Sequence, residues 1–481
     1  MRTATAALLL GTLLLTAASG PADTAPVEAL KQQALKDLEG SYADYRKVAL
    51  QIWDYAEVGY KETRSSALLQ KTLRANGFNV QAGVAEIPTA FVATYGSGEP
   101  VIGILAEFDA LPGLSQQAVP AKQAVAGQDA GHGCGHHLFG AASVAAGIEL
   151  KKLLQQHKLK GTIKVYGTPA EEGGSGKVYM VRDGLFKGVD AVVHWHPANE
   201  NRTMLNNYLA NSSAKFRFRG VSAHAAMAPE RGRSGLDAVE AMNHMVNLMR
   251  EHVPQETRIH YVITSGGKAP NVVPDYAEVY YYVRHPKKDD VAAIFARVVK
   301  AAEGAALGTG TSMEYEVIGG THDLLLNETL AKALQQNLTR VGGVQYSPQE
   351  QEFGRKIQAS FGFAAPPLEA AASISPYTMH EGGGSTDVGD VSYTVPTVGL
   401  EAATWVPGTA AHSWQAVACG GTEIGTKGML VAAKTMTLTA LDLLTNPDLL
   451  SQAKEEFNQD IGSYQYKPLL GNRKPALNYR D

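Results

Sequence analysis

The sequence predicts an α/β protein in which a layered α/β domain carries a smaller inserted unit. Three observations support this fold class. Short apolar runs typical of buried strands alternate with segments of helical periodicity. Polar, metal-competent residues follow those runs directly. Between about residues 205 and 320, the pattern changes to strands with one polar face.

The early part of the chain and its four apolar runs predict the layered domain. Residues 38–80 carry apolar side chains every three or four positions, which is the period of an amphipathic helix. Four short apolar runs are interpreted as largely buried strands, at 101–106, 162–166, 189–193 and 395–400. Alternation of this kind is typical of helices layered on a sheet.

Polar residues follow each of the four predicted strands. Open α/β sheets bind their ligands beyond the carboxyl ends of the strands, so one site built from four segments is expected. Its candidate residues are Glu107 and Asp109 after the first strand, Glu171 and Glu172 after the second, His194 and His196 after the third, and His412 beyond the fourth.

The inserted unit is predicted as two layers, one of strands and one of helices. Its strands alternate polar and apolar side chains, as strands with one wet face do. The predicted elements are strands at 215–219 and 277–284 and helices at 236–249, which Ser234 and Asp237 open like a capping box, and at 290–302. Residues 341–384 are rich in Gly, Pro, Ala and Ser and predict only loops and short helix.

The N-terminus has the pattern of a secretory signal peptide over residues 1–22. Arg2 precedes an apolar stretch that is too short for a membrane span, and small residues follow it. No later run of about 20 apolar residues is present. We therefore expect a soluble chain, periplasmic or secreted, with no membrane contact after signal removal. An apolar N-terminal helix of a cytoplasmic protein is the alternative.

The composition of the chain limits the classes of molecule that it is expected to bind. The 481 residues are enough for two or three domains with a large core. The 43 Lys+Arg and 47 Asp+Glu are nearly balanced and form no block of like charge, so nucleic acid is not expected. The 2 cysteines cannot form a disulfide framework. Cys419 is interpreted as a small buried apolar residue.

The segment Gly131–His137 carries three imidazoles and the thiol of Cys134 within seven residues. Thiolates and imidazoles are ligands of borderline divalent metals, and the glycines allow a tight turn around an ion. In extended chain Glu171 and Glu172 point to opposite sides, so one is free to bind metal while the other faces the reacting water. His194 and His196 share one side of a strand, and the residues alone leave the choice between them open.

Three residues of the inserted unit are candidates for substrate contact. His224, within Ser222–Ala226, suits a lid that brings a proton donor to a developing oxyanion. Asn271 and Arg284 suit an anionic substrate, and Arg matches the geometry of a carboxylate.

Eight motifs in this order resemble the metallo-amidohydrolases of the aminoacylase and carboxypeptidase (M20) superfamily. Within it, they are most similar to the branch of the B-type subunit of p-aminobenzoyl-glutamate hydrolase. The resemblance spans nearly all of the chain after residue 22. The motifs are Glu107–Pro112, Gly131–His136, Ala170–Gly174, Trp195–Pro197, Gly220–Ala226, Pro270–Val273, Ser385–Asp390 and His412–Gln415.

The resemblance implies a mixed-sheet α/β/α domain with a dinuclear metal site and an inserted α+β lid and dimerisation domain. It places the metal ligands at Cys134, His136, Glu172, His196 and His412, and so favours His196 over His194. It implies Glu171 as the catalytic base, Asp109 as a residue that supports the ligands, and His224 as a residue that reaches the partner subunit. The domain boundaries become 1–22 for the signal peptide, 23–205 and 323–481 for the catalytic domain, and 206–322 for the insert.

The function expected from this resemblance is metal-dependent hydrolysis of the amide bond of N-acyl amino acids or dipeptides, such as p-aminobenzoyl-glutamate-like substrates. Two divalent ions are expected, Mn²⁺ or Zn²⁺, with Co²⁺ as a third candidate. A homodimer through the insert, or a hetero-subunit assembly, is implied. At position 137 this chain has His, where relatives often carry Asn or Asp.

Two other functions are weighed. Cys134 could act as a nucleophile without metal, but this leaves Glu171, Glu172, His196 and His412 without a role. An exported, non-catalytic binding or assembly subunit of the same fold is the second, and the presence of all candidate ligands and of the base argues against it.

Overall fold

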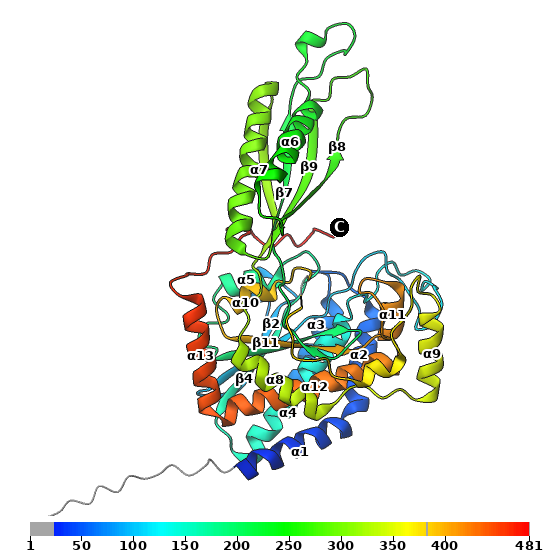
Figure 1. The fold of residues 1–481 in the computed structure, drawn as a ribbon, viewed down its shortest axis with the longest axis vertical. Coiled ribbons are helices and arrows are strands. Elements are labelled where there is room, and N and C mark those ends of the chain that lie inside the picture. The colour runs from blue at the N-terminus through cyan, green and yellow to red at the C-terminus, as the bar shows by residue number, and fades with distance from the viewer. Residues whose placement is uncertain (1–23, 381–382, 481) are drawn as a thin grey trace, which may run out of the picture.

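The computed structural model describes residues 24–380 and 383–480 (Figure 1). The predicted signal peptide lies outside the described residues. Two bodies are visible: a large α/β body below, and an elongated unit that rises from it and contains α6, α7, β7, β8 and β9. Each body has its own cluster of buried apolar side chains, which is the physical criterion for two separate domains.

The large body is built on a seven-stranded mixed sheet with the order β1-β2-β4-β3-β5-β11-β6. The four central strands are parallel, and the strands added at either edge are antiparallel. Their bounds are β1 Asn79–Ala82, β2 Phe91–Ser97, β3 Val101–Ala106, β4 Gly161–Gly167, β5 Ala191–Ala198, β6 Arg202–Thr203 and β11 Thr397–Ala403.

The four strands predicted from apolar runs are the four central strands, β4, β3, β5 and β11. They are parallel neighbours, so their carboxyl ends lie at one edge of the sheet. The predicted convergence of four segments on that edge is confirmed. Parallel strands that are buried on both faces appear in a sequence as continuous apolar runs. These four strands could therefore be predicted, whereas the edge strands could not.

Helices pack around this sheet. The two long helices α4 and α12 pack against each other and against its central strands. The helices of the large body are α1 Thr24–Gly40, α2 Tyr42–Tyr55, α3 Thr63–Ala75, α4 His136–His157, α5 Gly176–Arg182, α8 Glu328–Val341, α9 Pro348–Gln358, α10 Val388–Ser392, α11 Trp414–Gly420, α12 Glu423–Thr445 and α13 Pro447–Ile461.

Within the described residues, α12 alone is long and apolar enough to cross a membrane. Of its most apolar window, 72% is buried inside the protein, so it is a core helix of this body. Its apolar residues pack against the sheet and against α4 rather than being presented outward.

The inserted unit is a four-stranded antiparallel sheet, in the order β10-β7-β9-β8, against which α6 and α7 pack. Its elements are β7 Ala210–Arg219, α6 Gly235–Met249, β8 Arg258–Ser265, β9 Tyr276–His285, α7 Lys288–Thr309 and β10 Ser312–Thr321. Alternate side chains of β9 are buried, as its sequence predicted, and the two-layer architecture is confirmed.

The expectations for the irregular parts of the sequence hold only in part. The helical pattern of residues 38–80 is confirmed as far as Ala75: the segment holds the end of α1 and the whole of α2 and α3, and then the start of β1. Residues 341–384, expected as loops and short helix, contain the eleven-residue helix α9, which Ser347 and Glu350 open with a capping box. The strands β8 and β10 were not predicted. β8 carries apolar side chains at alternate positions, Ile259, Tyr261 and Ile263, but most of its side chains are exposed.

Candidate metal and catalytic site

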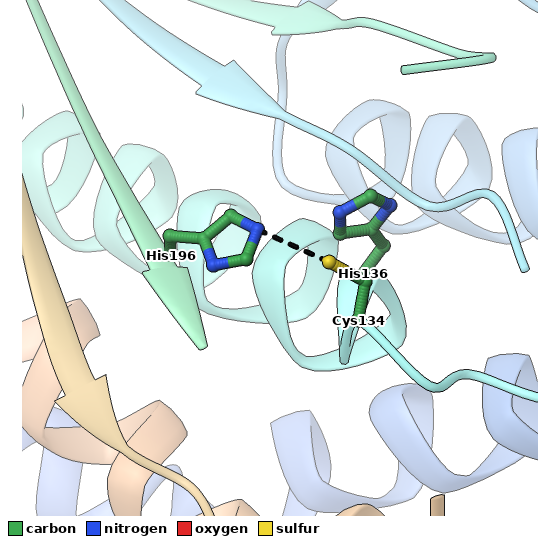
Figure 2. A group of neighbouring side chains, drawn as sticks. All are labelled: Cys134, His136 and His196. Carbon is green, nitrogen blue, oxygen red and sulfur yellow. Dashed lines mark hydrogen bonds between the residues drawn. The ribbon is translucent and has the colours of Figure 1, made fainter. Parts of the chain in front are cut away.

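The loop before α4 brings Cys134 and His136 to the carboxyl end of β5. Gly135, at the start of α4, has a left-handed backbone with φ of 76°. A Cβ atom there would lie 2.7 Å from the Cβ of Pro197, so both the conformation and the close approach to β5 require glycine. This contact places the Cys134 Sγ 3.4 Å from His196 Nε2 (Figure 2).

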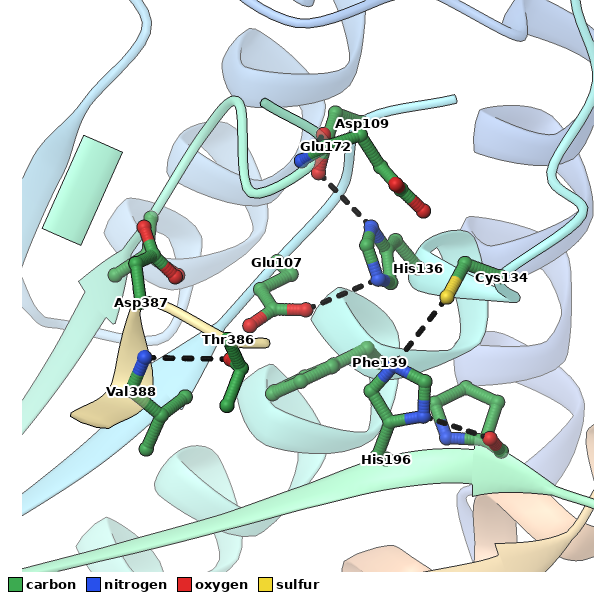
Figure 3. Close-up of polar contacts among 12 residues, drawn as sticks. Glu107, Asp109, Cys134, His136, Phe139, Glu172, His196, Thr386, Asp387 and Val388 are labelled. Carbon is green, nitrogen blue, oxygen red and sulfur yellow. Dashed lines mark hydrogen bonds and ion pairs between the residues drawn. The ribbon is translucent and has the colours of Figure 1, made fainter. Parts of the chain in front are cut away.

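His136 is completely buried between two carboxylates (Figure 3). Its Nδ1 lies 2.9 Å from Asp109 Oδ1 and its Nε2 lies 3.1 Å from Glu107 Oε2. Burial would lower the pKa of this imidazole, but the nearby Cys134, Glu107 and Asp109 raise it well above its ordinary value. Asp109 fixes the ring through Nδ1, as a carboxylate commonly does for a metal-binding histidine, while Nε2 lies against Glu107.

Glu171 and Glu172 lie in a tight turn after β4, so the expectation of extended chain at this pair was wrong. Ala170 enters the turn with φ of 57°, a left-handed value that a residue with a side chain rarely adopts. The two carboxylates nevertheless belong to different groups of side chains. Glu172 joins Cys134 and His412, and Glu171 joins Glu107 and His136.

The Glu172 carboxylate lies 3.2 Å from His412 Nε2. Burial alone would raise the pKa of Glu172, but the hydrogen bond to His412 and the charge of His136 lower it. The same hydrogen bond raises the pKa of His412. His412 has φ of 58°, and such left-handed residues cluster at functional sites, where surrounding contacts hold them.

Glu171 has a different environment from its neighbour. Burial, followed by the charges of Glu107 and Glu172, raises its pKa well above the ordinary value of a glutamate. Two adjacent carboxylates whose environments move their pKa values apart are suited to different roles, one as an ionised ligand and the other as a proton carrier.

Among the described residues, the five predicted ligands fall into two of the three groups whose ligand atoms lie close enough to hold a metal ion, the third group being Glu107, His136 and Glu171. Cys134, His136 and His196 make one group, and Cys134, Glu172 and His412 make the other; within each, the ligand atoms lie within 4.8 Å of one another. The shared thiol places the two groups side by side. Sulfur, imidazole and carboxylate donors of this kind fit borderline divalent ions, so all five predicted ligands are brought together.

His194 and His137 lie outside these groups. His194 Nε2 packs against the backbone of β11, where a Cβ on Gly399 would clash with it. Burial lowers the pKa of His194 to about 3, so the ring is neutral. The ring of His137 lies tilted by 47° against that of His132, at 4.8 Å between centroids, and its Nε2 lies 3.0 Å from the carbonyl oxygen of Gly420. Cys419 is a buried free thiol in the core, as expected.

Sequence reasoning missed a buried ionic network beside the site. Lys177, on α5, is fully buried, and its ammonium lies 2.6 Å from Glu107 Oε1 and 2.6 Å from Asp387 Oδ1. Glu107 thus contacts Lys177 through one oxygen and His136 through the other. Nothing in the sequence distinguishes Lys177 from a surface lysine, although it follows the glutamate pair by only five residues.

The metal-competent groups form one wall of a cleft of about 530 Å³. The cleft is also lined by Arg202, Tyr208 and Glu401, which bond to one another: the Arg202 guanidinium donates to both carboxylate oxygens of Glu401, at 2.6 and 3.0 Å. A cleft of this volume, lined by several polar groups, fits a small molecule.

Within one chain, the three predicted residues of the insert do not reach this cleft. His224 and Asn271 lie together in neighbouring loops of the insert, where Ala225 N donates to the carbonyl oxygen of Asn271. Arg284 lies near the base of the insert on β9, and its guanidinium packs over the ring of Tyr282. None of the three is among the residues that line the cleft.

Comparisons with known proteins agree with this architecture. Residues 211–309 match the family model of the peptidase dimerisation domain. The chain is 40% identical to the B-type subunit of p-aminobenzoyl-glutamate hydrolase of Escherichia coli (strain K12), over 91% of this chain and 97% of that protein. It is 28% identical to the Xaa-Arg dipeptidase of Homo sapiens, over 92% of this chain and 94% of that protein.

Solved structures share the fold. A putative aminohydrolase from methicillin-resistant Staphylococcus aureus has a TM-score of 0.64 at 17% identity, with 86% of this chain and all of that chain covered. A dinuclear metal-binding peptidase of the M20 family from Bacillus subtilis has a TM-score of 0.59 at 17% identity, with 85% and 99% covered.

A mixed α/β domain with an inserted dimerisation domain, and with sulfur, imidazole and carboxylate ligands at the ends of its central strands, defines a metal-binding hydrolase that acts on amide bonds. The chain belongs to the M20 peptidase family, in the branch of the B-type subunit of p-aminobenzoyl-glutamate hydrolase.

Proposed function

We propose that this chain hydrolyses the amide bond of small N-acyl amino acids or dipeptides, including p-aminobenzoyl-glutamate-like compounds. The observation that carries the proposal is the pair of ligand groups that share Cys134, beside Glu171, a half-buried glutamate of the cleft with a raised pKa. The 40% identity to one subunit of a p-aminobenzoyl-glutamate hydrolase, over nearly the whole chain, supports the substrate class.

Two divalent ions would be held by Cys134, His136, Glu172, His196 and His412, with Asp109 orienting His136. Mn²⁺ and Zn²⁺ are the proposed ions, with Co²⁺ as a third candidate. When bound, ions at such a site acidify water and polarise a carbonyl oxygen.

Glu171 would carry the proton in the reaction. A carboxylate oxygen of Glu171 accepts a proton from the attacking water and then donates it to the leaving amine nitrogen. Its half-buried position at the cleft supports this exchange, because partial burial and the charges of Glu107 and Glu172 raise its pKa well above the ordinary value of a glutamate.

The insert would supply the remaining contacts from a second subunit. His224 would donate a hydrogen bond to the developing oxyanion, and Asn271 and Arg284 would hold the substrate carboxylate. The match of residues 211–309 to a dimerisation domain supports a homodimer through the insert, with a hetero-subunit arrangement as the second assembly. We also propose that the protein is periplasmic or secreted, on the pattern of residues 1–22.

A substrate panel tests this function. N-acyl amino acids and dipeptides would be compared with their carboxamides, which lack the negative charge. We expect kcat/KM to be higher for the carboxylates by about tenfold or more, and expect Arg284→Ala to remove that preference. Equal turnover of acids and carboxamides by both proteins would contradict the assignment of Arg284. Metal-loaded protein that hydrolyses none of these compounds would favour a non-catalytic binding or assembly subunit.

A further inference from the structure

The C-terminal segment, residues 462–480, leaves α13 and runs between the inserted unit and the large body (Figure 1, red). It contains no helix or strand, yet it contacts both domains through specific side chains. Leu470 of this segment is fully buried, and Tyr466, Leu469, Leu477 and Tyr479 pack against the cores of the two domains.

The first part of the segment is fixed at the junction of the two domains. The Tyr464 hydroxyl lies 2.7 Å from His322 Nε2, directly after β10, and the Tyr466 hydroxyl donates to Asp390 Oδ1 at 2.7 Å. Asp390 also accepts a hydrogen bond from the backbone N–H of His322. The start of the segment is therefore held by hydrogen bonds at the junction of the two domains.

The middle of the segment is held by the insert and by α5. The Arg473 guanidinium donates to the carbonyl oxygens of Val317 and Ile318, at the irregularity in the pairing of β10 with β7. The carbonyl oxygen of Arg473 in turn accepts a hydrogen bond of 2.6 Å from Arg182, at the end of α5.

The last part of the segment reaches the catalytic turn. The Tyr479 hydroxyl and the Arg480 guanidinium both donate to the backbone carbonyl oxygen of Glu172, at 3.0 and 2.6 Å. The Tyr479 hydroxyl fits beside Glu172 because residue 59 is glycine. A Cβ atom at Gly59 would clash with the hydroxyl oxygen of Tyr479. The ring of Tyr479 packs edge to face on Tyr60, which itself bonds to the carbonyl oxygen of Gly174.

Both backbone groups of Glu172 are thus fixed by side chains from elsewhere in the chain. Its N–H donates to Asp109 at 2.9 Å, and its carbonyl oxygen accepts from the C-terminal segment. The turn contains two left-handed residues, Ala170 and Gly173, and external contacts of this kind are what hold such a backbone in place.

We propose that Tyr479 and Arg480 are positioning residues of the active site. By holding the Glu172 carbonyl oxygen, they orient the Glu172 carboxylate toward Cys134 and His412. This inference rests on the proposed function, in which Glu172 is a metal ligand. The hydrogen bond from Arg480 is charge-assisted, so it contributes more than a neutral one.

The test is Mn²⁺ affinity of the metal-free protein, measured by competition with a chelator. For Tyr479→Phe combined with Arg480→Gln, we expect Mn²⁺ affinity to fall about 10–100-fold, the usual cost of losing a contact that orients a ligand. Tyr479→Phe alone removes one oxygen atom and is expected to lower affinity about fivefold without disturbing the fold. The matched control is Lys474→Gln, in the same segment, which removes only an exposed ion pair with Glu86; its Mn²⁺ affinity should equal that of the wild type.

A double-mutant comparison separates orientation of Glu172 from general stability. In a Glu172→Ala background, the Tyr479 and Arg480 substitutions should lower Mn²⁺ affinity no further, because the ligand that they orient is gone. Unchanged affinity in the Tyr479→Phe, Arg480→Gln variant, or an equal loss in Lys474→Gln, would overturn the inference while leaving the function intact. A wild-type protein that binds no metal would contradict both.

Discussion

The imidazole of His136 depends on one neighbour for its orientation. Asp109 accepts from Nδ1 at 2.9 Å and also accepts from the backbone N–H of Glu172, so a single carboxylate fixes two candidate ligands. His136 and Asp109 are both buried. The pKa of Asp109 lies below its ordinary value, because the charge and hydrogen bond of His136 outweigh the effect of burial. Asp109 therefore sets the geometry of the site without being in either ligand group.

We expect Asp109→Asn to weaken metal binding. The amide keeps the size of the side chain but cannot accept from both His136 and Glu172 with the charge of a carboxylate. Metal affinity should fall about 10–100-fold, as measured by titration of the metal-free protein. Asp129→Asn is a suitable control, since Asp129 Oδ2 only accepts from the backbone of an exposed loop. Unchanged affinity in Asp109→Asn would mean that His136 is oriented by other contacts.

Glu62 makes the stability depend on pH. It is buried, accepts from the N–H of Ala170 and from Thr89, and burial together with the charge of Asp109 raises its pKa to about 8. Between its ordinary value of 4.5 and about 8, the folded state holds a proton that the unfolded state has lost, so stability falls as pH rises.

Glu62→Gln should remove this dependence. The free energy of unfolding of the wild type, relative to the variant, should decrease with rising pH by at most about 1.4 kcal/mol per unit over that window. Urea denaturation at a series of pH values measures it. Parallel stability curves for the two proteins would show that Glu62 titrates normally.

The sequence predicted which residues belong to the site better than it predicted their contacts. Cys134 and His136 were found because thiol and imidazoles crowd one glycine-rich segment, which is a local pattern. Lys177 and Tyr479 were not found, because each acts across a long sequence separation that no local pattern encodes. The choice of His196 over His194 also came from the resemblance and not from the residues. In the structure, Cys134 contacts His196, whereas His194 packs on the backbone of β11.

Three secondary-structure elements meet at Lys177. It lies on α5, Glu107 follows β3, and Asp387 precedes α10, so one buried ammonium ties the carboxyl end of the sheet to two helices. The charges of Asp387 and Glu107, against the opposing effect of burial, raise the pKa of Lys177, so it remains a cation.

Lys177→Met should be strongly destabilising. The methionine fills similar space but leaves two buried carboxylates without their cation, which typically costs roughly 3–5 kcal/mol. Chemical denaturation measures the loss. Lys356→Met, which removes an exposed helical pair with Glu352, should leave stability nearly unchanged. A loss no larger than that of the control would mean that water replaces the lysine at low cost.

At the scale of elements, the buried strands and one helix of the insert were predictable: the helix expected at 236–249 is α6, and Ser234 caps it as expected. The four apolar runs became the four central strands, because burial on both faces leaves a continuous apolar signature. The exposed edge strand β8 carries no such signature. The Glu171–Glu172 pair was expected in extended chain, whereas the left-handed Ala170 turns it away from the sheet, a feature that tertiary contacts impose.

The candidate functional residues are divided between the large body and the insert. All candidate ligands lie in the large body, while His224 and Asn271 lie in loops of the insert that do not line the cleft of the same chain. If a second subunit supplies these residues, each active site is built from two chains, and dimerisation is a condition of activity.

Co-expression of two inactive variants tests this shared site. Glu171→Gln damages the site of its own chain, and His224→Ala damages the site of its partner. A mixed dimer would therefore hold one complete site. We expect each variant alone to lose most activity and the mixture to regain about a quarter of it, since half of the dimers are mixed and each has one intact site. No recovery, in dimers shown to be mixed, would place His224 outside the partner's site.

The central claim is that this chain uses two metal ions and Glu171 to hydrolyse amides. Its most direct test is the metal content of the purified protein, paired with hydrolysis of N-acyl amino acids and dipeptides before and after chelation, in the wild type and in Glu171→Ala. The account predicts two ions per chain, turnover that chelation abolishes and added metal restores, and a Glu171→Ala variant that keeps its metal but loses about 10²–10⁴-fold in rate. Full activity of metal-free protein would contradict it and favour Cys134 as a nucleophile.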